Sequence, residues 1–211
     1  MKTEIIKVDT DRVEPDKLDL IKTVLKEDGV MAYPTDTFYG IGANCFSEDS
    51  IRKVYLLKKR DLSKPLSVII ADSSQLDELV GEIPPIFRPL SSEFWPGPLT
   101  VVFRASEKLP EILLGHSRSI GVRYPDFKWL RALVRHTGFP VTATSANFSR
   151  EAETRDPKCV REDFSGKIDL IVDGGLTPGI QSSTVIDISS GFVKILREGA
   201  LPVSLFRKYQ E

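Results

Sequence analysis

Two polar segments, far apart in the sequence, each follow a run of apolar residues. Residues 33–37 read Tyr-Pro-Thr-Asp-Thr, and residues 142–147 read Thr-Ala-Thr-Ser-Ala-Asn. Each segment on its own is typical of an ordinary turn after a strand. In an open α/β sheet, however, ligands bind in the crevice beyond the carboxyl ends of the strands. We therefore expect both tips to face one pocket, where their hydroxyl and amide groups would orient a small polar substrate.

A concentration of basic residues between these segments suggests a second kind of chemistry. The basic residues of this run are Arg52, Lys53, Lys58, Lys59, Arg60 and Lys64. Such a run is usually a solvated helix face, and the C-terminus of a helix favours cations in any case. Ile51, Val54 and Tyr55, however, form an apolar helical stripe whose continuation falls on Lys58. An inward lysine at a helix end suggests a phosphate site and, with the polar tips, a nucleotide-using enzyme.

Two arginines occur within apolar strand patterns. Arg123 follows residues 120–122, and Arg197 follows residues 193–196. A strand arginine is either exposed on one face or aimed into a site, and period-two alternation does not distinguish these cases. A Walker A loop is absent, and residues 40–42 lack the third glycine of a dinucleotide-binding fingerprint. A nucleotide would therefore bind without either of the common phosphate loops.

The elements that must position these groups alternate between helices and strands. The predicted helices are residues 17–26, 48–58, 73–80 and 85–95. We expect Gly29 to cap the first of them at its end and Ser47 to cap the second at its start. The predicted strands are residues 30–33, 66–71, 99–103, 119–124, 141–144, 170–172, 183–188 and 193–196. The last two strands read as a hairpin, so we predict a mixed α/β sheet rather than a purely parallel one.

The composition indicates a globular protein with one substantial core. The chain has 211 residues, of which 41% are hydrophobic and 28% charged, and its formal net charge is -1. We interpret residues 1–211 as a single domain, because no linker or repeat divides them. The net charge gives no global positive field that would indicate a nucleic-acid partner.

Cysteine and histidine are too scarce for a disulfide framework or a zinc site. These residues are Cys45, Cys159, His116 and His136. We therefore assign no metal to protein side chains. The N-terminal residues lack the apolar centre of a signal peptide, and no run approaches the ~18 apolar residues of a membrane span. We predict a reduced, cytoplasmic protein without membrane contact.

Taken together, the motifs resemble the YrdC-like family of threonylcarbamoyl-AMP synthases. They occur in the family's order, at residues 33–40, 58–60, 64–66, 95–100, 121–125, 145–147, 183–187 and 196–199. The resemblance implies a twisted, mixed, open α/β sheet with flanking helices around a large concave cavity. It also implies the short, single-domain form of the family.

The implied reaction converts L-threonine, bicarbonate and ATP into threonylcarbamoyl-AMP and pyrophosphate. Mg²⁺ would accompany the ATP, and a downstream transferase complex would pass the threonylcarbamoyl group to tRNA. By family position, the residues that bind threonine are Thr35, Arg123, Ser145 and Ser183. The residues that bind ATP are Lys58, Arg60, Ser119, Asn147 and Arg197. Lys58 and Arg60 would also be catalytic, since neutralising and positioning two anionic reactants are the main tasks.

Two positions depart from the family pattern. Lys59 stands where the family usually has glycine, which puts the local backbone in question. Arg150 stands where a glycine commonly follows the Ser-Ala-Asn motif, which puts the loop near the substrate in question. Two alternatives stay open: a non-catalytic RNA-binding protein of the same fold, with salt-sensitive affinity, and a carbamoyl-handling paralogue. A weak direct contact with tRNA also stays open.

Overall fold

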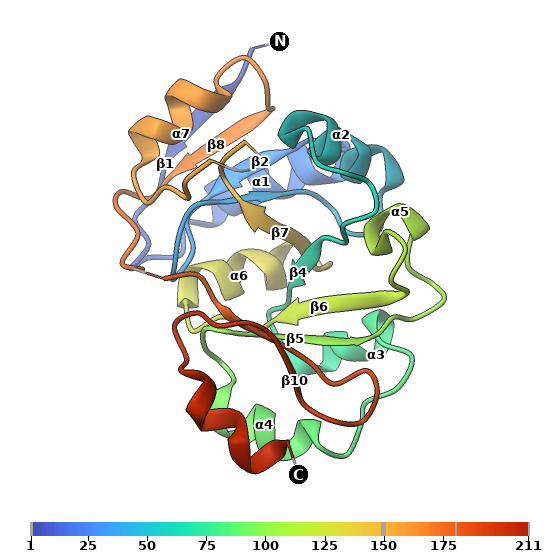
Figure 1. The fold of residues 1–211 in the computed structure, drawn as a ribbon. Helices are drawn as coiled ribbons and strands as arrows, with labels where there is room; N and C mark the ends of the chain where they lie inside the picture. Colours follow the sequence, from blue (N-terminus) through green and yellow to red (C-terminus); the bar gives the residue numbers. More distant parts are fainter. Residues whose placement is uncertain (1, 149–150, 180, 211) are drawn as a thin grey trace.

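The strands of the chain assemble into one continuous sheet (Figure 1). The structure is a computed structural model that describes residues 2–148, 151–179 and 181–210. Within these ranges the sheet has ten strands in the order β1-β8-β2-β3-β7-β4-β6-β5-β9-β10. The strands are β1 (Glu4–Lys7), β2 (Met31–Tyr33), β3 (Gly40–Gly42), β4 (Ser67–Ile69), β5 (Leu99–Arg104), β6 (Ser119–Arg123), β7 (Val141–Ser145), β8 (Leu170–Asp173), β9 (Thr184–Asp187) and β10 (Lys194–Arg197).

Parallel and antiparallel pairs are both present, which confirms the predicted mixed α/β class. β8 pairs in parallel with β1 and β2, β4 with β6, and β5 with β9. The predicted hairpin is also present, because β9 and β10 are antiparallel with Ile186 opposite Ile195. β2 and β7 are each antiparallel to β3, so they run in the same direction. Their last residues, Tyr33 and Ser145, both lie opposite Gly40 and hence at the same edge of the sheet.

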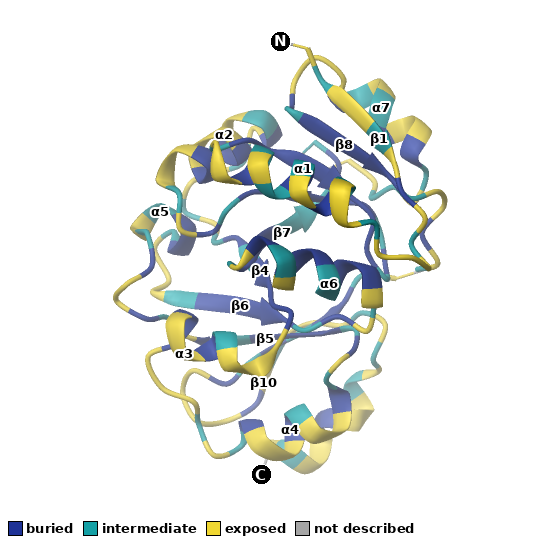
Figure 2. Cartoon of the chain, turned by 180° about the vertical axis from the view of Figure 1, so that it is seen from behind, coloured by how far each residue is buried: buried dark blue, intermediate teal, exposed yellow. Residues whose placement is uncertain are grey.

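Helices cover both faces of the sheet. α1 (Pro15–Lys26) and α6 (Lys128–Thr137) lie side by side over one face (Figure 2). The other helices are α2 (Glu48–Lys58), α3 (Leu76–Leu79), α4 (Phe87–Phe94), α5 (Glu111–Leu114) and α7 (Pro157–Phe164), with the 3-10 helices η1 (Ser73–Gln75) and η2 (Val203–Tyr209). In the described ranges no helix combines the length and the apolar character needed to cross a membrane.

The alternation of side chains along the central strand β4 shows which apolar cluster lies on which face of the sheet. In β4, Val68 packs in the cluster that contains the buried side chains of α2, α3 and α4. The next residue, Ile69, packs in the cluster that contains α1 and α6. Successive strand side chains point to opposite faces, so the two clusters lie on opposite sides of the sheet. The central strands are therefore packed by apolar side chains on both faces.

The sequence prediction missed several regular elements, although α6 has a clear amphipathic pattern of buried residues. They are β1, β3, α5, α6, α7 and η2. β3 was missed because glycine weakens a strand pattern. A Cβ atom on Gly42 would lie 2.6 Å from the Tyr33 ring and 2.7 Å from Val141, so close packing requires glycine there. Residues 73–80 also differ from the prediction, because the segment begins as η1 before α3.

The end of α1 differs from the sequence prediction. Gly29 was expected to provide the left-handed cap, but Asp28 has the positive φ of 58°. The Gly29 N–H donates to the carbonyl oxygen of Val24 at 2.8 Å. A Cβ atom at Gly29 would lie 2.5 Å from a methyl carbon of Val24. Glycine is therefore needed for close approach to the helix, while aspartate supplies the left-handed turn, which its short polar side chain tolerates.

The start of α2 is capped by Ser47 as predicted, and Lys59 ends the helix in a left-handed backbone conformation. The Ser47 side chain accepts a hydrogen bond from the Ser50 N–H. Lys59 ends the helix with φ 50° and ψ 41°, in the left-handed region. The backbone conformation that a glycine would favour is thus kept, with a lysine in it. Arg150, the other departure, lies outside the described residues.

We expect Lys59→Gly to raise the free energy of unfolding by roughly 0.5–1 kcal/mol. A residue with a Cβ atom in the left-handed region costs roughly 1–2 kcal/mol, and the extra freedom of glycine in the unfolded chain offsets part of the gain. Lys59→Ala is the matched control, because it removes the charge but keeps the strain. Urea unfolding of both variants measures the effect. Equal stabilisation by alanine and glycine would show that charge, not backbone strain, is responsible.

Candidate active site

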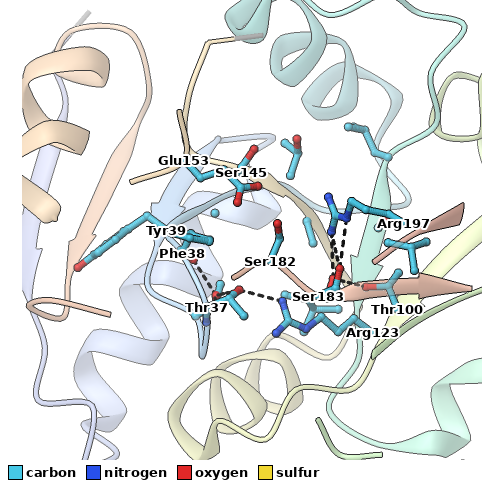
Figure 3. A pocket seen from close by; sticks show the side chains of 18 of the residues that line it. Thr37, Phe38, Tyr39, Thr100, Arg123, Ser145, Glu153, Ser182, Ser183 and Arg197 are labelled. Atoms are coloured by element: carbon cyan, nitrogen blue, oxygen red, sulfur yellow. Dashed lines mark hydrogen bonds between the residues drawn. The ribbon is translucent and has the colours of Figure 1, made fainter. Parts of the chain in front are cut away.

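A polar cavity of about 230 Å³ opens where the two polar tips meet. Thr35 and Thr37 line it from the tip that follows β2, and Ser145 lines it from the end of β7. Arg123 reaches it from β6 and Ser183 from the residue before β9 (Figure 3). The expectation that the two tips face one pocket is therefore confirmed. The cavity is smaller than the roughly 300–1,000 Å³ of drug-sized sites. It suits a molecule the size of an amino acid, and a nucleotide would extend beyond it.

The first tip is both a turn and a wall of the cavity. The Thr35 hydroxyl donates to the Phe38 carbonyl oxygen at 2.7 Å and accepts from the Thr37 N–H at 3.0 Å. These bonds use the hydroxyl to hold the turn, as threonine commonly does in loops. The Thr37 side chain, which sequence reasoning did not single out, is instead in contact with Arg123.

Arg123 is a buried residue whose guanidinium group reaches this tip. Only 7% of the residue is exposed, so the alternative of a sheet-surface arginine is wrong. Its Nη2 donates to Asp36 Oδ1 at 2.8 Å, and its Nη1 donates to Thr37 Oγ1 at 3.2 Å. The arginine thus joins β6 to the segment after β2, across the middle of the sheet.

The far wall of the cavity is a chain of hydrogen bonds centred on Ser183. The Arg197 guanidinium donates to the Ser183 carbonyl oxygen at 2.8 Å and to its hydroxyl oxygen at 3.3 Å. The Ser183 hydroxyl lies 2.8 Å from the Thr100 hydroxyl. Figure 3 shows the Arg197 side chain pointing at Ser183, with Arg123 on the other side of that serine. Two guanidinium groups therefore flank one buried serine.

Lys58 points inward as predicted and is only 2% exposed. Its ammonium group donates to the carbonyl oxygens of Ser145 and Asn147 and to Asn147 Oδ1. The Ser145 hydroxyl also donates to Asn147 Oδ1, at 2.6 Å. An ammonium group has three hydrogens, so it can donate to several acceptors at once. Lys58 and Asn147 therefore hold the second tip from behind, and neither is among the described residues that line the cavity.

Burial of Lys58 changes its titration. Removal from water, with a smaller contribution from the nearby Arg60 charge, lowers the pKa of Lys58 to about 8. The ammonium form still predominates at neutral pH. Arg60 itself is half-buried and lines the cavity, and its Nη2 donates to the Pro65 carbonyl oxygen at 2.9 Å.

Ser119 is a further predicted site residue that does not line the cavity. It lies at the start of β6, opposite Arg104, whereas Arg123 ends the same strand. Four residue steps along the strand separate the two by ~13 Å. The Ser119 hydroxyl is directed at the Ser117 carbonyl oxygen, 3.4 Å away.

Sequence reasoning missed several residues of the cavity wall. They are Thr37, Ser67, Thr100, Glu153 and Ser182. Thr37 belongs to the polar segment 33–37, and Thr100 belongs to the family motif at residues 95–100. The sequence therefore pointed to both residues. Glu153 had no such signal: it lies in a loop that the Tyr39 N–H holds by donating to the Thr154 carbonyl oxygen at 2.9 Å.

The charges around the cavity favour an anionic or zwitterionic ligand. Among its described lining residues the cations are Arg60, Arg123 and Arg197, and the only carboxylate is Glu153. In the described part of the chain, no group of three or more histidine, cysteine, aspartate or glutamate side chains is placed to hold a metal ion.

A mixed α/β sheet with a small cavity lined by arginines and hydroxyl groups is the arrangement that the comparisons with known proteins can be set against. The chain belongs to the Sua5/YciO/YrdC family. The model of that family, which carries the description "Telomere recombination", matches residues 23–199.

Relatives within this family are similar over nearly all of the chain. The threonylcarbamoyl-AMP synthase of Pyrococcus abyssi is 37% identical over 198 residues, which cover 94% of this chain and 58% of that protein. The putative threonylcarbamoyl-AMP synthase of Methanocaldococcus jannaschii is 30% identical over 205 residues, 96% of each chain. The chain thus spans little more than half the length of the first relative and almost all of the second.

A solved structure confirms the predicted fold. Pyrococcus abyssi Sua5 complexed with L-threonine superposes with a TM-score of 0.92 at 37% sequence identity. The alignment covers 98% of this chain and 61% of that one. The twisted α/β sheet with flanking helices is therefore the fold of this family.

Proposed function

We propose that this chain is an L-threonylcarbamoyladenylate synthase, a nucleotidyltransferase that uses L-threonine, bicarbonate and ATP. The observation that carries the proposal is the buried Arg123 guanidinium beside Thr37 and across from Ser183. A planar guanidinium recognises a carboxylate through two parallel hydrogen bonds. Hydroxyl groups on the opposite walls suit the amine and hydroxyl of threonine. The similarity to a Sua5 that binds L-threonine supports the same ligand.

The proposed reaction needs no nucleophilic side chain. The threonine nitrogen attacks the carbon of bicarbonate, a C–N bond forms, and water leaves to give the N-carboxylate. An oxygen of that carboxylate then attacks the α-phosphorus of ATP, and the bond to the β-phosphate oxygen breaks. Pyrophosphate leaves, and threonylcarbamoyl-AMP remains. Because both reactants are anions, the tasks of the protein are to position them and neutralise charge.

ATP would lie toward the cationic side of the site. Arg60 and Arg197 line the cavity and can contact phosphates, while Lys58 and Asn147 support the tip that would face them. Ser119 would be reached only by a part of the nucleotide that extends along β6. Mg²⁺ would arrive with the triphosphate. A separate transferase would then move the threonylcarbamoyl group to tRNA.

The direct test of the proposed function is product formation. Purified chain with ATP, Mg²⁺ and bicarbonate should release pyrophosphate and form an adenylate only when L-threonine is present. Omission of bicarbonate is the control, because simple amino-acid adenylation does not need it. Binding of RNA in a salt-sensitive manner, with no pyrophosphate release, would instead favour a non-catalytic RNA-binding protein.

We expect L-serine to be a poor but detectable substrate. Serine lacks only the methyl group, and one methyl in a fitted pocket is worth ~1–3 kcal/mol, or roughly 10- to 200-fold in specificity. The measurement is kcat/KM for both amino acids at saturating ATP and bicarbonate. Equal values would mean that this cavity does not select its amino acid by the side chain.

A further inference from the structure

The carboxylate of Asp36 does not line the cavity, but it contacts Arg123, which does. Asp36 Oδ1 accepts from Arg123 Nη2 at 2.8 Å, and the two side chains are only 15% and 9% exposed. Arg123 and Thr37 line the cavity, whereas Asp36 does not belong to its described lining residues. Asp36 therefore reaches the site only through the guanidinium group that it holds.

The guanidinium group depends on this contact for its orientation. Its terminal nitrogens donate to Asp36 and Thr37, but its buried Nε–H has no acceptor among the described residues. A buried donor without a partner is costly, so the group would gain by turning toward another acceptor. Thr37 offers a neutral acceptor at 3.2 Å, and the bond to Asp36 is shorter and charge-assisted. The carboxylate is thus the stronger of the two tethers.

We propose that Asp36 is a positioning residue, which fixes the Arg123 guanidinium in the orientation that receives the carboxylate of the amino-acid substrate. This inference rests on the proposed function, since it assigns a carboxylate ligand to Arg123. Bidentate recognition needs the plane of the guanidinium to be set before the ligand arrives. Asp36 sets that plane from behind and leaves the cavity side to the ligand.

The role of Asp36 can be tested, because two explanations predict opposite effects of Asp36→Asn on threonine binding. If Asp36 merely competes with the substrate carboxylate, Asp36→Asn should tighten threonine binding. If Asp36 positions Arg123, Asp36→Asn should weaken it by roughly 10- to 100-fold, the range for one lost charge-assisted hydrogen bond. The affinity for ATP should stay within about twofold of wild type in either case.

The experiment is calorimetric binding of L-threonine and of L-threoninamide, in which a neutral amide replaces the carboxylate. Positioning predicts that Asp36→Asn loses much of the preference for threonine over the amide, and that KM for threonine rises while kcat changes little. Asp36→Glu, which keeps the charge, should restore part of the preference for threonine over the amide. It replaces Asp36→Asn as the test variant if the asparagine variant does not fold. Unchanged or tighter threonine binding in Asp36→Asn overturns the proposal, as does wild-type preference in both variants.

The matched control is Asp173→Asn, which also breaks an aspartate–arginine pair, in which Asp173 is nearly buried and Arg161 is partly exposed. Asp173 Oδ2 accepts from Arg161 Nη1 at 2.8 Å, and neither residue is among those that line the cavity. We expect this variant to lose stability without changing the preference for threonine over its amide. An equal loss of preference in the control would make the effect of Asp36 merely structural. Wild-type protein that binds no threonine at all would overturn the proposed function itself.

Discussion

Replacing Arg123 with lysine is expected to weaken L-threonine binding by roughly 100-fold or more. Lysine keeps the positive charge but loses the planar pair of donors that a carboxylate accepts. Two charge-assisted hydrogen bonds are at stake, each worth about 1.5–3 kcal/mol. The measurement is calorimetric titration with threonine, and titration with ATP shows whether the variant is folded. Wild-type affinity for threonine in Arg123→Lys would require the threonine site to be assigned to other residues.

Arg123→Ala is the less informative change, because it should also destabilise the protein. It would leave Asp36 buried without its cation, and breaking a buried ion pair from one side costs on the order of 3 kcal/mol. Arg123→Ala combined with Asp36→Asn removes that charge and should recover part of the stability. Additive losses in the double variant would show that the two side chains do not act as a pair. This coupling is also why the residue cannot be treated as a solvent-exposed strand arginine.

Replacing Lys58 with methionine is expected to lower both stability and ATP affinity. The ammonium group satisfies three oxygens of residues 145 and 147, and a buried acceptor left without its donor costs ~1–3 kcal/mol. We expect a loss of about 3 kcal/mol in the free energy of unfolding and at least a tenfold loss in ATP affinity. Arg60→Ala is the comparison: it should weaken ATP binding with a much smaller loss of stability.

The protonation of Lys58 should also appear in the pH dependence of ATP binding. Because burial lowers the pKa of Lys58 to about 8, the cation is present below that pH and lost above it. Wild-type affinity for ATP should therefore fall as the pH rises from 7 to 9.5, with a midpoint near 8. In Lys58→Met this fall should disappear. A fall of equal size in the variant would assign the titration to another group.

Local pattern and simple topology predicted a substantial part of the site. Helical periodicity placed Lys58 on the inward face of α2, because a stripe of Ile51, Val54 and Tyr55 continues to it within one turn. The rule that parallel strands share an edge brought the two polar tips together. Both inferences succeeded because they need only the direction of a chain segment and the residues next to it.

The conformation at positions 28, 29 and 59 was beyond the sequence patterns. Each depends on a backbone angle or on a close approach that residue type alone does not specify. Asp28 and Lys59 occupy the left-handed region although neither is a glycine, and Gly29 is required by the nearby Val24. Residue type alone gives only a preference for such conformations, so local packing decides between candidates.

The amino-acid sequence by itself determined the mixed α/β class, the family motifs and the inward direction of Lys58. Only the tertiary structure decided that Arg123 is buried, that Asp36 and Thr37 hold it, and that Glu153 enters the cavity while Ser119 does not. The physical reason is sequence distance: Asp36 and Arg123 are 87 positions apart. Periodicity records which face of an element is apolar, whereas a polar pair between two strand ends depends on how the whole sheet is ordered and twisted.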